Sequence, residues 1–194
     1  MRVLVACEFS GVVREAFRAK GHDAWSCDLL PALDGSPYHF RFDIYRLLQG
    51  YYKSSYDKLT DEPWDLIIAH PPCTYLSVSG NRHYAHRPDL YEPAVEFAKS
   101  FFAYADRVCV ENPVGRLSTL WRKPDQYVQP WMFGHGETKK TGFWLKNLPL
   151  LKPTDIVEGR EQRIWKIAPS ENRGYLRSIT YKGIAEAMAE QWGK

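Results

Sequence analysis

One cysteine follows two prolines at the end of a short apolar run, and this arrangement could support nucleophilic chemistry. Leu66 to Ala69 has the composition of a strand that is buried on both faces. Pro71 and Pro72 cannot extend a strand or open directly into a helix, so the chain must turn and deliver Cys73 just beyond it. Ligands of open α/β sheets bind at the carboxyl ends of central strands. Cys73 is therefore a candidate nucleophile, and a small thiol packed in a loop is the simpler alternative.

A carboxylate holds the same kind of position at the end of another predicted strand. Arg107 to Glu111 is a short β-branched run, and Asn112 and Pro113 end it. If the two strands are neighbours, Cys73 and Glu111 share one cleft. Nucleophilic attack on a ring needs this pairing when the ring must also be protonated or held.

The elements that must position these groups begin at the N-terminus with a βαβ unit. The pattern predicts a strand over Arg2 to Cys7, a helix over Val12 to Lys20 and a second strand over His22 to Cys27. Gly21 is typical of a helix C-terminus, and the second strand ends at an acid, Asp28. This order opens a nucleotide-binding α/β fold.

The ligand of that unit is less defined, because Gly11 stands alone where a dinucleotide fingerprint has several glycines. Helix N-terminal amides near Gly11 are candidate ligand contacts, and Asp28 is a candidate hydrogen-bond acceptor for a ribose. Phe40 to Asp43 is a candidate third strand. Asp43 suits an adenosine site or a helix N-cap, and the sequence does not decide between them.

Thr74 to Pro88 is predicted to be a long loop without regular structure of its own, a kind of loop that is often functional. Its basic, aromatic and hydroxyl groups suit an anionic substrate with a π face, and they include Ser77 and Arg82. His83 and His86, with His70 nearby, match no common metal signature, so no metal is expected.

The remaining chain is predicted to complete an α/β sheet. Tyr91 to Ala105 and Ile184 to Trp192 are helical, while Trp131 to Phe133 and Gly142 to Leu145 form an antiparallel hairpin at the sheet edge. Lys146 to Arg177 is irregular and basic, which suits nucleic acid or a solvated surface. Beyond Lys146 itself, its cations are Lys152, Arg160, Arg163, Lys166, Arg173 and Arg177.

Composition limits the class of protein. The 194 residues suit a single domain spanning residues 1–194, with 25% charged and 44% hydrophobic residues and a formal net charge of +3. That charge permits a nucleic-acid partner without arguing for one. No apolar run is long enough for a membrane span and no secretory signal is visible. The dispersed cysteines predict neither a disulfide framework nor a zinc site and favour a reducing cytoplasm; they are Cys7, Cys27, Cys73 and Cys109.

From Val3 to about Gln191, the order of these features resembles that of the cytosine-C5 DNA methyltransferases. The matching segments are Phe9-Ser10-Gly11, Asp28, Asp43, Pro71-Pro72-Cys73, Glu111-Asn112, the turn from Glu137 to Phe143, and Tyr181 to Ala189. The resemblance implies a Rossmann-like methyltransferase fold, with a mostly parallel central sheet, helices on both faces and an antiparallel edge hairpin. It implies S-adenosylmethionine as cofactor.

The resemblance also implies roles for individual residues. The catalytic set would be Cys73, Glu111 and Lys139. The cofactor set would be Phe9, Ser10, Gly11, Asp28, Asp43 and Pro71. The substrate set would be Pro72, Ser77, Arg82, Asn112, Lys140 and Arg163.

The sequence departs from the family at four positions, namely Thr74, Pro113, Glu137 and Thr141. It also lacks room for a large target-recognition domain, and only Lys146 to Arg177 could replace one, so it resembles small phage-type or prophage-type members. The expected substrate is cytosine in duplex or single-stranded DNA. The alternatives are a free cytosine nucleotide and a non-catalytic protein that binds nucleic acid or another partner. Neither a membrane nor a metal is expected, and the oligomeric state is left open.

Overall fold

A computed structural model describes residues 1–50, 62–168, 170 and 173–194, except for the side chains of residues 81, 82 and 165. The described residues form a seven-stranded sheet in the order β3-β2-β1-β4-β5-β7-β6. The strands are β1 (Arg2–Ala6), β2 (Asp23–Asp28), β3 (His39–Arg41), β4 (Trp64–Ala69), β5 (Ala105–Pro113), β6 (Gln126–Val128) and β7 (Thr141–Lys146). The pairs from β3 to β5 are parallel, and β7 is antiparallel to both of its neighbours.

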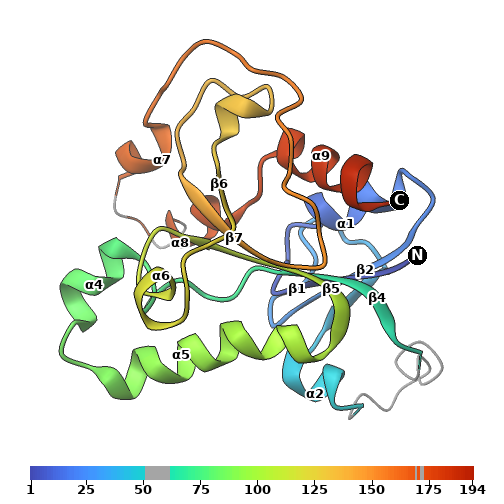
Figure 1. Cartoon of the computed structure of the whole chain (residues 1–194), viewed down its shortest axis with the longest axis horizontal. Helices are drawn as coiled ribbons and strands as arrows, with labels where there is room; N and C mark the ends of the chain where they lie inside the picture. The colour runs from blue at the N-terminus through green and yellow to red at the C-terminus, as the bar shows by residue number, and fades with distance from the viewer. Residues whose placement is uncertain (51–61, 169, 171–172) are drawn as a thin grey trace.

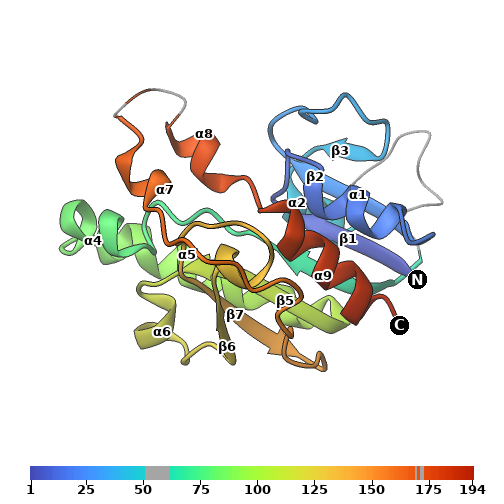
Figure 2. The same cartoon turned by 90° about the horizontal axis from the view of Figure 1, so that it is seen from above.

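Helices cover both faces of this sheet (Figures 1 and 2). They are α1 (Val12–Arg18), α2 (Ile44–Leu48), α4 (Val78–Tyr84), α5 (Pro88–Ser100), α6 (Leu117–Leu120), α7 (Arg163–Lys166), α8 (Arg173–Ser178) and α9 (Lys182–Trp192), with 3₁₀ turns η1 (Phe101–Ala103) and η2 (Pro130–Met132). Alternate residues of β1 enter opposite layers: Val3 and Val5 pack with α1 and α9, whereas Leu4 and Ala6 pack with α2 and α5. The sheet is therefore buried on both sides, as its apolar strands require.

The direction of the strand order reverses between β1 and β4. The chain runs outward from β1 to β3, and then returns to place β4 and β5 on the other side of β1. In such a sheet the crevice beyond the carboxyl ends of these strands is the usual ligand site. Ala6 pairs with Ala69, and Ala69 pairs with Val110, so the segments that follow β1, β4 and β5 begin side by side.

The main predicted elements are confirmed. The strands expected at Arg2 to Cys7, Leu66 to Ala69 and Arg107 to Glu111 correspond to β1, β4 and β5, and the closing helix is α9. Gly21 has a φ of 81°, the left-handed conformation expected just beyond a helix. The expected fold, a mostly parallel α/β sheet with an antiparallel edge, is the one observed.

The loop expected from Thr74 to Pro88 is the first error. It contains α4, and α5 already begins at Pro88. Ser77 starts α4 because its hydroxyl accepts a hydrogen bond from the backbone N–H of Gly80 at 3.1 Å. The many polar residues of this segment concealed an ordinary N-cap.

The edge hairpin is correct in kind but wrong in one strand. Trp131 and Met132 fall in the 3₁₀ turn η2 and Phe133 follows it, whereas the strand that pairs with β7 is β6. Pro130 occupies the first position of that turn and fixes its backbone for a tight helical turn. The helix expected from Tyr91 to Ala105 also ends earlier, because β5 has begun by Ala105.

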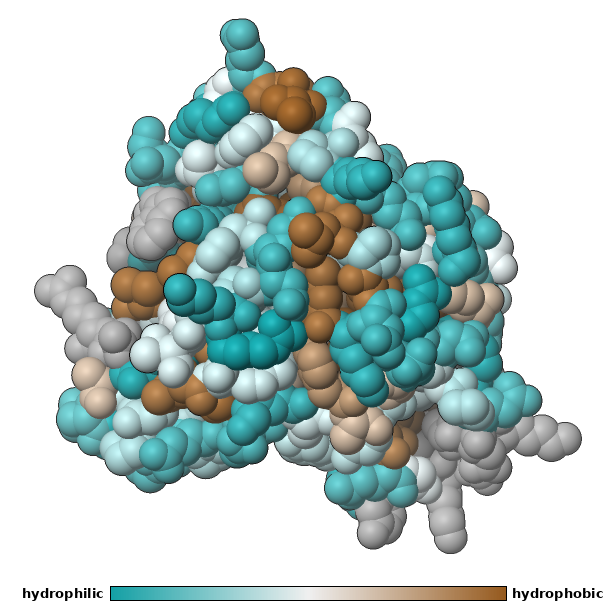
Figure 3. All heavy atoms as spheres, in the orientation of Figure 1, coloured by the Kyte–Doolittle hydropathy of each residue, from teal (hydrophilic) through white to brown (hydrophobic). Residues whose placement is uncertain are grey.

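The surface is mainly hydrophilic, with an apolar stripe near the middle of the face in Figure 3. Among the described residues, no helix is both long enough and apolar enough to cross a bilayer. The large apolar side chains gather instead in the two layers against the sheet.

Candidate active site

A cavity of about 430 Å³ opens at the carboxyl ends of β1, β4 and β5. This volume lies within the range of small-molecule sites in proteins. Cys73 and Glu111 both line the cavity, as the positions of their strands predict. Other lining residues come from the segment after β1, from α4, from the turn before β7 and from α8; they include Glu8, Phe9, His70, Ser79, Lys139 and Arg177.

The backbone around Cys73 is held by hydrogen bonds on both sides. The buried Asn112 amide donates from Nδ2 to the carbonyl oxygen of Pro71 at 2.8 Å, so the end of β5 fixes the turn that follows β4. The carbonyl oxygen of Cys73 accepts from the N–H groups of Leu76 at 3.1 Å and Ser77 at 2.9 Å. Cys73 therefore has a defined position, although its side chain is exposed.

A second clamp joins the same two segments further along the chain. The N–H of Arg116 donates to the carbonyl of Leu76 at 2.7 Å, and the N–H of Val78 donates to that of Val114 at 3.2 Å. A Cβ atom at Gly115 would lie 1.9 Å from the Leu76 oxygen, so only glycine permits this approach. These contacts fix the backbone that carries Cys73 relative to the end of β5, the strand that carries Glu111.

The charges near Cys73 act in both directions. Cys73 is exposed through the open side of the cavity, yet the protein atoms around it and the charge of Glu111 raise the pKa of its thiol. The positive charges of Lys139 and Arg177 lower that pKa and partly offset the increase. The free site therefore holds the protonated thiol near neutral pH, and the thiolate forms as pH rises.

Replacement of Lys139 by methionine should slow alkylation of Cys73 by iodoacetamide. Loss of the positive charge raises the thiol pKa further, so at about pH 8 the thiolate fraction and the rate should fall about threefold or more. The measurement is the alkylation rate at Cys73 against pH, followed by mass spectrometry. Lys152→Met, which removes an exposed lysine far from the cavity, should leave the profile unchanged. An unshifted profile in Lys139→Met would contradict this electrostatic assignment.

Glu111 remains ionised despite its burial. Burial raises the pKa of Glu111, but the hydrogen bond and charge of His70, the charge of Lys139 and the hydroxyl of Thr141 together hold that pKa below its ordinary value. The Nδ1 atom of His70 lies 3.4 Å from Oε2 of Glu111. Glu111 therefore presents a carboxylate beside the thiol, ready to accept or share a proton.

The N-terminus of α1 has no amide left for a ligand, and here the sequence expectation is wrong. The N–H groups of Val13 and Arg14 donate to the two carboxylate oxygens of Glu8 at 2.7 and 3.2 Å. That of Val12 donates to Ser10 Oγ at 3.4 Å. The buried Glu8 thus occupies the position that a phosphate would take, and its negative charge favours a cationic ligand group.

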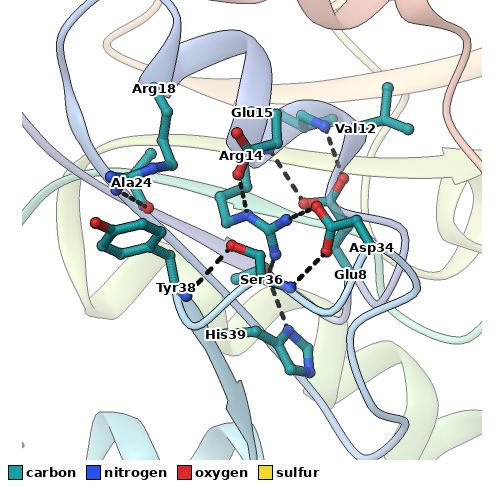
Figure 4. Close-up of polar contacts among 12 residues, drawn as sticks. Glu8, Val12, Arg14, Glu15, Arg18, Ala24, Asp34, Ser36, Tyr38 and His39 are labelled. Carbon is teal, nitrogen blue, oxygen red and sulfur yellow. Dashed lines mark hydrogen bonds and ion pairs between the residues drawn. The ribbon is translucent and has the colours of Figure 1, made fainter.

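The side chain of Arg14, on α1, lies in a network of polar contacts with neighbouring segments (Figure 4). Its guanidinium group is fully buried, pairs with Asp34 and Glu15, and donates to Ser26 Oγ at 2.8 Å. The Ser26 hydroxyl also lies 2.8 Å from Nδ1 of His39. This network joins α1 and β2 to the loop that follows β2.

Replacement of Arg14 by leucine should lower the free energy of unfolding by about 3 kcal/mol, because it removes the buried partner of several polar groups. Urea denaturation measures this change as a lower midpoint. Glu15→Gln, which alters the half-exposed partner, should cost less than about 1 kcal/mol. Equal midpoints for wild type and Arg14→Leu would refute the structural role of this network.

The cavity brings together most, but not all, of the residues expected from the sequence. Those that line it are Phe9, Ser10, Pro71, Pro72, Cys73, Ser77, Glu111, Asn112, Lys139 and Lys140. Arg163 lies outside the lining and pairs with Glu137 at 2.6 Å. Gly11 lines a separate groove between α1 and α9, and the side chain of Arg82 lies outside the described part of the structure.

Asp28 and Asp43 are also outside the cavity lining. The Asp43 side chain caps α2 by accepting from the N–H of Arg46 at 3.0 Å, which is one of the two roles open at the sequence level. Asp28 is the last residue of β2 and is followed by two exposed apolar residues, Leu29 (69% exposed) and Leu30 (46% exposed). An acid beside exposed apolar groups suits the ribose and the flat ring of a nucleoside.

Several residues of the site were not assigned from the sequence. No role was assigned to Glu8 or Arg14 from the sequence, and His70 was considered only as a metal ligand. Tyr175 stacks on Phe9 with ring centroids 4.4 Å apart, which brings α8 over the segment after β1. An acid two residues beyond a strand and before a helix is the one signal that could have identified Glu8 as a cap.

Within the described part of the chain, no three histidine, cysteine, aspartate or glutamate side chains are grouped so that they could hold a metal ion. All four cysteines are free thiols.

Comparisons with known proteins support the fold. No protein-family model matches the sequence, and no curated protein sequence matches it. Among solved structures, the chain is similar to the Entamoeba histolytica methyltransferase EhMeth, with a TM-score of 0.51 and 11% sequence identity. The similarity covers 84% of this chain, which spans only 57% of EhMeth. The chain therefore has a Rossmann-like methyltransferase fold.

Proposed function

We propose that this protein transfers a methyl group from S-adenosylmethionine to C5 of cytosine in DNA, through a covalent adduct with Cys73. The observation that carries the proposal is that one cavity, beyond the carboxyl ends of adjacent strands, is lined by both an exposed thiol and a half-buried carboxylate. The clamps between Asn112 and Pro71 and between Arg116 and Leu76 support it, because they fix the geometry of that pair.

The residues beside the cavity fit the proposed cofactor. S-adenosylmethionine carries a positive sulfonium and an ammonium group, and Glu8 provides a buried carboxylate at the end of β1. Asp28, with Leu29 and Leu30, offers an acceptor for ribose hydroxyls and an apolar surface for adenine. When bound, the cofactor supplies an electrophilic methyl group. The occupied amides of α1 argue against a dinucleotide, which needs them for its phosphates.

The chemistry required of the protein follows from the electronic structure of cytosine, whose C5 is a poor nucleophile. The Cys73 thiolate forms a bond to C6, and the C5–C6 electron pair moves into the ring toward N3. Glu111 holds N3 and stabilises this enamine-like state, in which C5 accepts the methyl group. C5 then loses its proton to solvent, the C5–C6 double bond forms again, and Cys73 leaves as the thiolate.

A base in duplex DNA has to leave the stack to reach Cys73, because the thiol lines a recessed cavity. The cavity is bordered by positive charges that suit a phosphate backbone. Lys139, Lys140 and Arg177 are the cations among its lining residues.

A labelled-methyl assay tests the proposal. The protein is incubated with labelled S-adenosylmethionine and, in separate reactions, with duplex DNA, single strands and dCMP. Label in C5 of cytosine is the expected result, and absence of label in every reaction would refute the proposal. If DNA is the substrate, affinity should fall steeply with salt as counterions are released.

A free cytosine nucleotide is the second candidate substrate. The three lining cations are part of the cavity wall itself, where one phosphate group of a bound nucleotide would lie. Transfer to dCMP, with weak salt dependence, would favour this substrate over DNA.

A further inference from the structure

His70 is a buried residue of the cavity that the mechanism above does not use. Its side chain is 9% exposed, and its Nε2 atom has no hydrogen-bond partner among the described residues. A buried ring nitrogen without a partner costs stability, so its retention in a polar site requires an explanation. The backbone N–H of His70 donates to the carbonyl of Ala6 at 2.9 Å, which fixes the residue at the ends of β1 and β4.

Two carboxylates interact with this imidazole, that of the half-buried Glu111 and that of the buried Glu8. On one side, Nδ1 lies 3.4 Å from Oε2 of Glu111. On the other, the positive charge of His70 lowers the pKa of Glu8, although burial keeps that pKa above its ordinary value. The remaining titratable groups of the cavity wall near Glu111 are Cys73 and Lys139. The Nδ1 atom of the ring is therefore placed so that a proton on it can pass directly to the carboxylate of Glu111.

The proposed reaction needs such a proton. Attack of the Cys73 thiolate on C6 drives an electron pair toward N3, and N3 must be protonated for the charge to be neutralised. Glu111 is held as a carboxylate in the free site and has no proton to give. When a proton passes from an imidazolium to the neighbouring carboxylate, the pair becomes a neutral imidazole beside a carboxylic acid and keeps the same number of protons. The pair of His70 and Glu111 can therefore protonate N3, which Glu111 alone cannot do.

We propose that His70 is a positioning residue that relays this proton through Glu111, an inference that rests on the proposed function. As the bond from sulfur to C6 forms, Glu111 takes a proton from Nδ1 of His70 and passes it to N3, which leaves His70 neutral and Glu111 again a carboxylate. As that bond breaks, the proton returns from N3 to Glu111 and then to His70. No proton is gained or lost by the pair over the cycle.

Exchange of the C5 hydrogen tests the relay without the cofactor. Addition of Cys73 to C6 makes C5 nucleophilic, so C5 can take a deuteron from D₂O and release its own proton before the thiol leaves. Exchange into dCMP and a single-stranded oligonucleotide, measured by mass spectrometry against pH, therefore reports addition and N3 protonation. In the wild type the rate should rise as the thiolate forms and fall again at higher pH, when the pair loses its proton.

His70→Asn is the informative variant, because its amide N–H occupies the place of Nδ1–H but holds no transferable proton. We expect its exchange rate to fall about 100-fold, with loss of the alkaline limb of the pH profile. His70→Gln is a second variant with the same expectation. His86→Gln, at an exposed histidine outside the cavity, is the matched control and should behave like wild type. Thermal melting verifies that each variant is folded.

The outcomes separate this inference from the proposed function. If wild type exchanges no C5 hydrogen and Cys73→Ala is indistinguishable from it, the proposed function fails. If wild type exchanges but its rate shows no alkaline limb, the relay is overturned whatever the folding of the variants. The relay is also overturned if a folded His70→Asn or His70→Gln protein exchanges C5 hydrogen at the wild-type rate. It is equally overturned if the exchange rate falls but the pH profile is unchanged, because His70 would then only hold Glu111 in place.

Discussion

Cys73→Ala is expected to abolish methyl transfer and leave cofactor binding nearly intact. The thiol provides the covalent step, and removal of a nucleophile that acts together with a neighbouring acid should cost about 10⁴-fold or more in turnover. Among the described residues, no hydrogen bond joins the Cys73 sulfur to the groups proposed to hold the cofactor, which are Glu8, Asp28 and Leu29. Label transfer and calorimetric titration of S-adenosylmethionine measure the two quantities.

Cys27→Ala is the matched control for this result. It removes an equally small thiol from β2, outside the cavity, and should retain wild-type turnover in the folded protein. Cys73→Ser tests the chemistry more finely, because a hydroxyl of nearly the same size is far less readily ionised; it should be as inactive as alanine. Turnover by Cys73→Ala close to that of wild type would exclude the covalent mechanism.

Glu111→Gln is expected to change two properties of the site in opposite directions. Turnover should fall by about 10²- to 10⁴-fold, because the amide keeps the shape of the side chain but cannot pass a proton to the ring. Reactivity of Cys73 toward iodoacetamide at about pH 8 should rise, because the charge of Glu111 is one of the causes that raise the pKa of the thiol. A disrupted site should lower both properties, so a rise in thiol reactivity together with a fall in turnover would show that the site is still folded.

The control for Glu111→Gln is Glu96→Gln, which makes the same change at an exposed position of α5. Both the alkylation profile of Cys73 and the turnover should match wild type. If Glu111→Gln lowered both properties together, Glu111 would be a structural group and the role assigned to it here would be wrong.

The sequence predicted the central strands well because their signals are local. Two runs have the composition of a buried strand, and proline follows each of them closely. They are the apolar run from Leu66 to Ala69 and the β-branched run before Glu111. Two helices of the opposite layers, α1 and α5, also follow from apolar spacing. Errors arose where the decisive contact lies one turn away or in another segment, as with the Ser77 cap of α4 and the turn at Pro130.

By itself, the sequence determined that Cys73 follows one buried strand and that Glu111 lies in the last part of another, because each apolar run is followed closely by proline. Only the tertiary structure decided what surrounds them. Burial and charge depend on segments far apart in the chain: Glu8 takes the amides of α1, Asn112 holds the turn before Cys73, and His70 meets Glu111 across two strands. Such contacts have no signature in local spacing, and they set the protonation states on which the proposed chemistry depends.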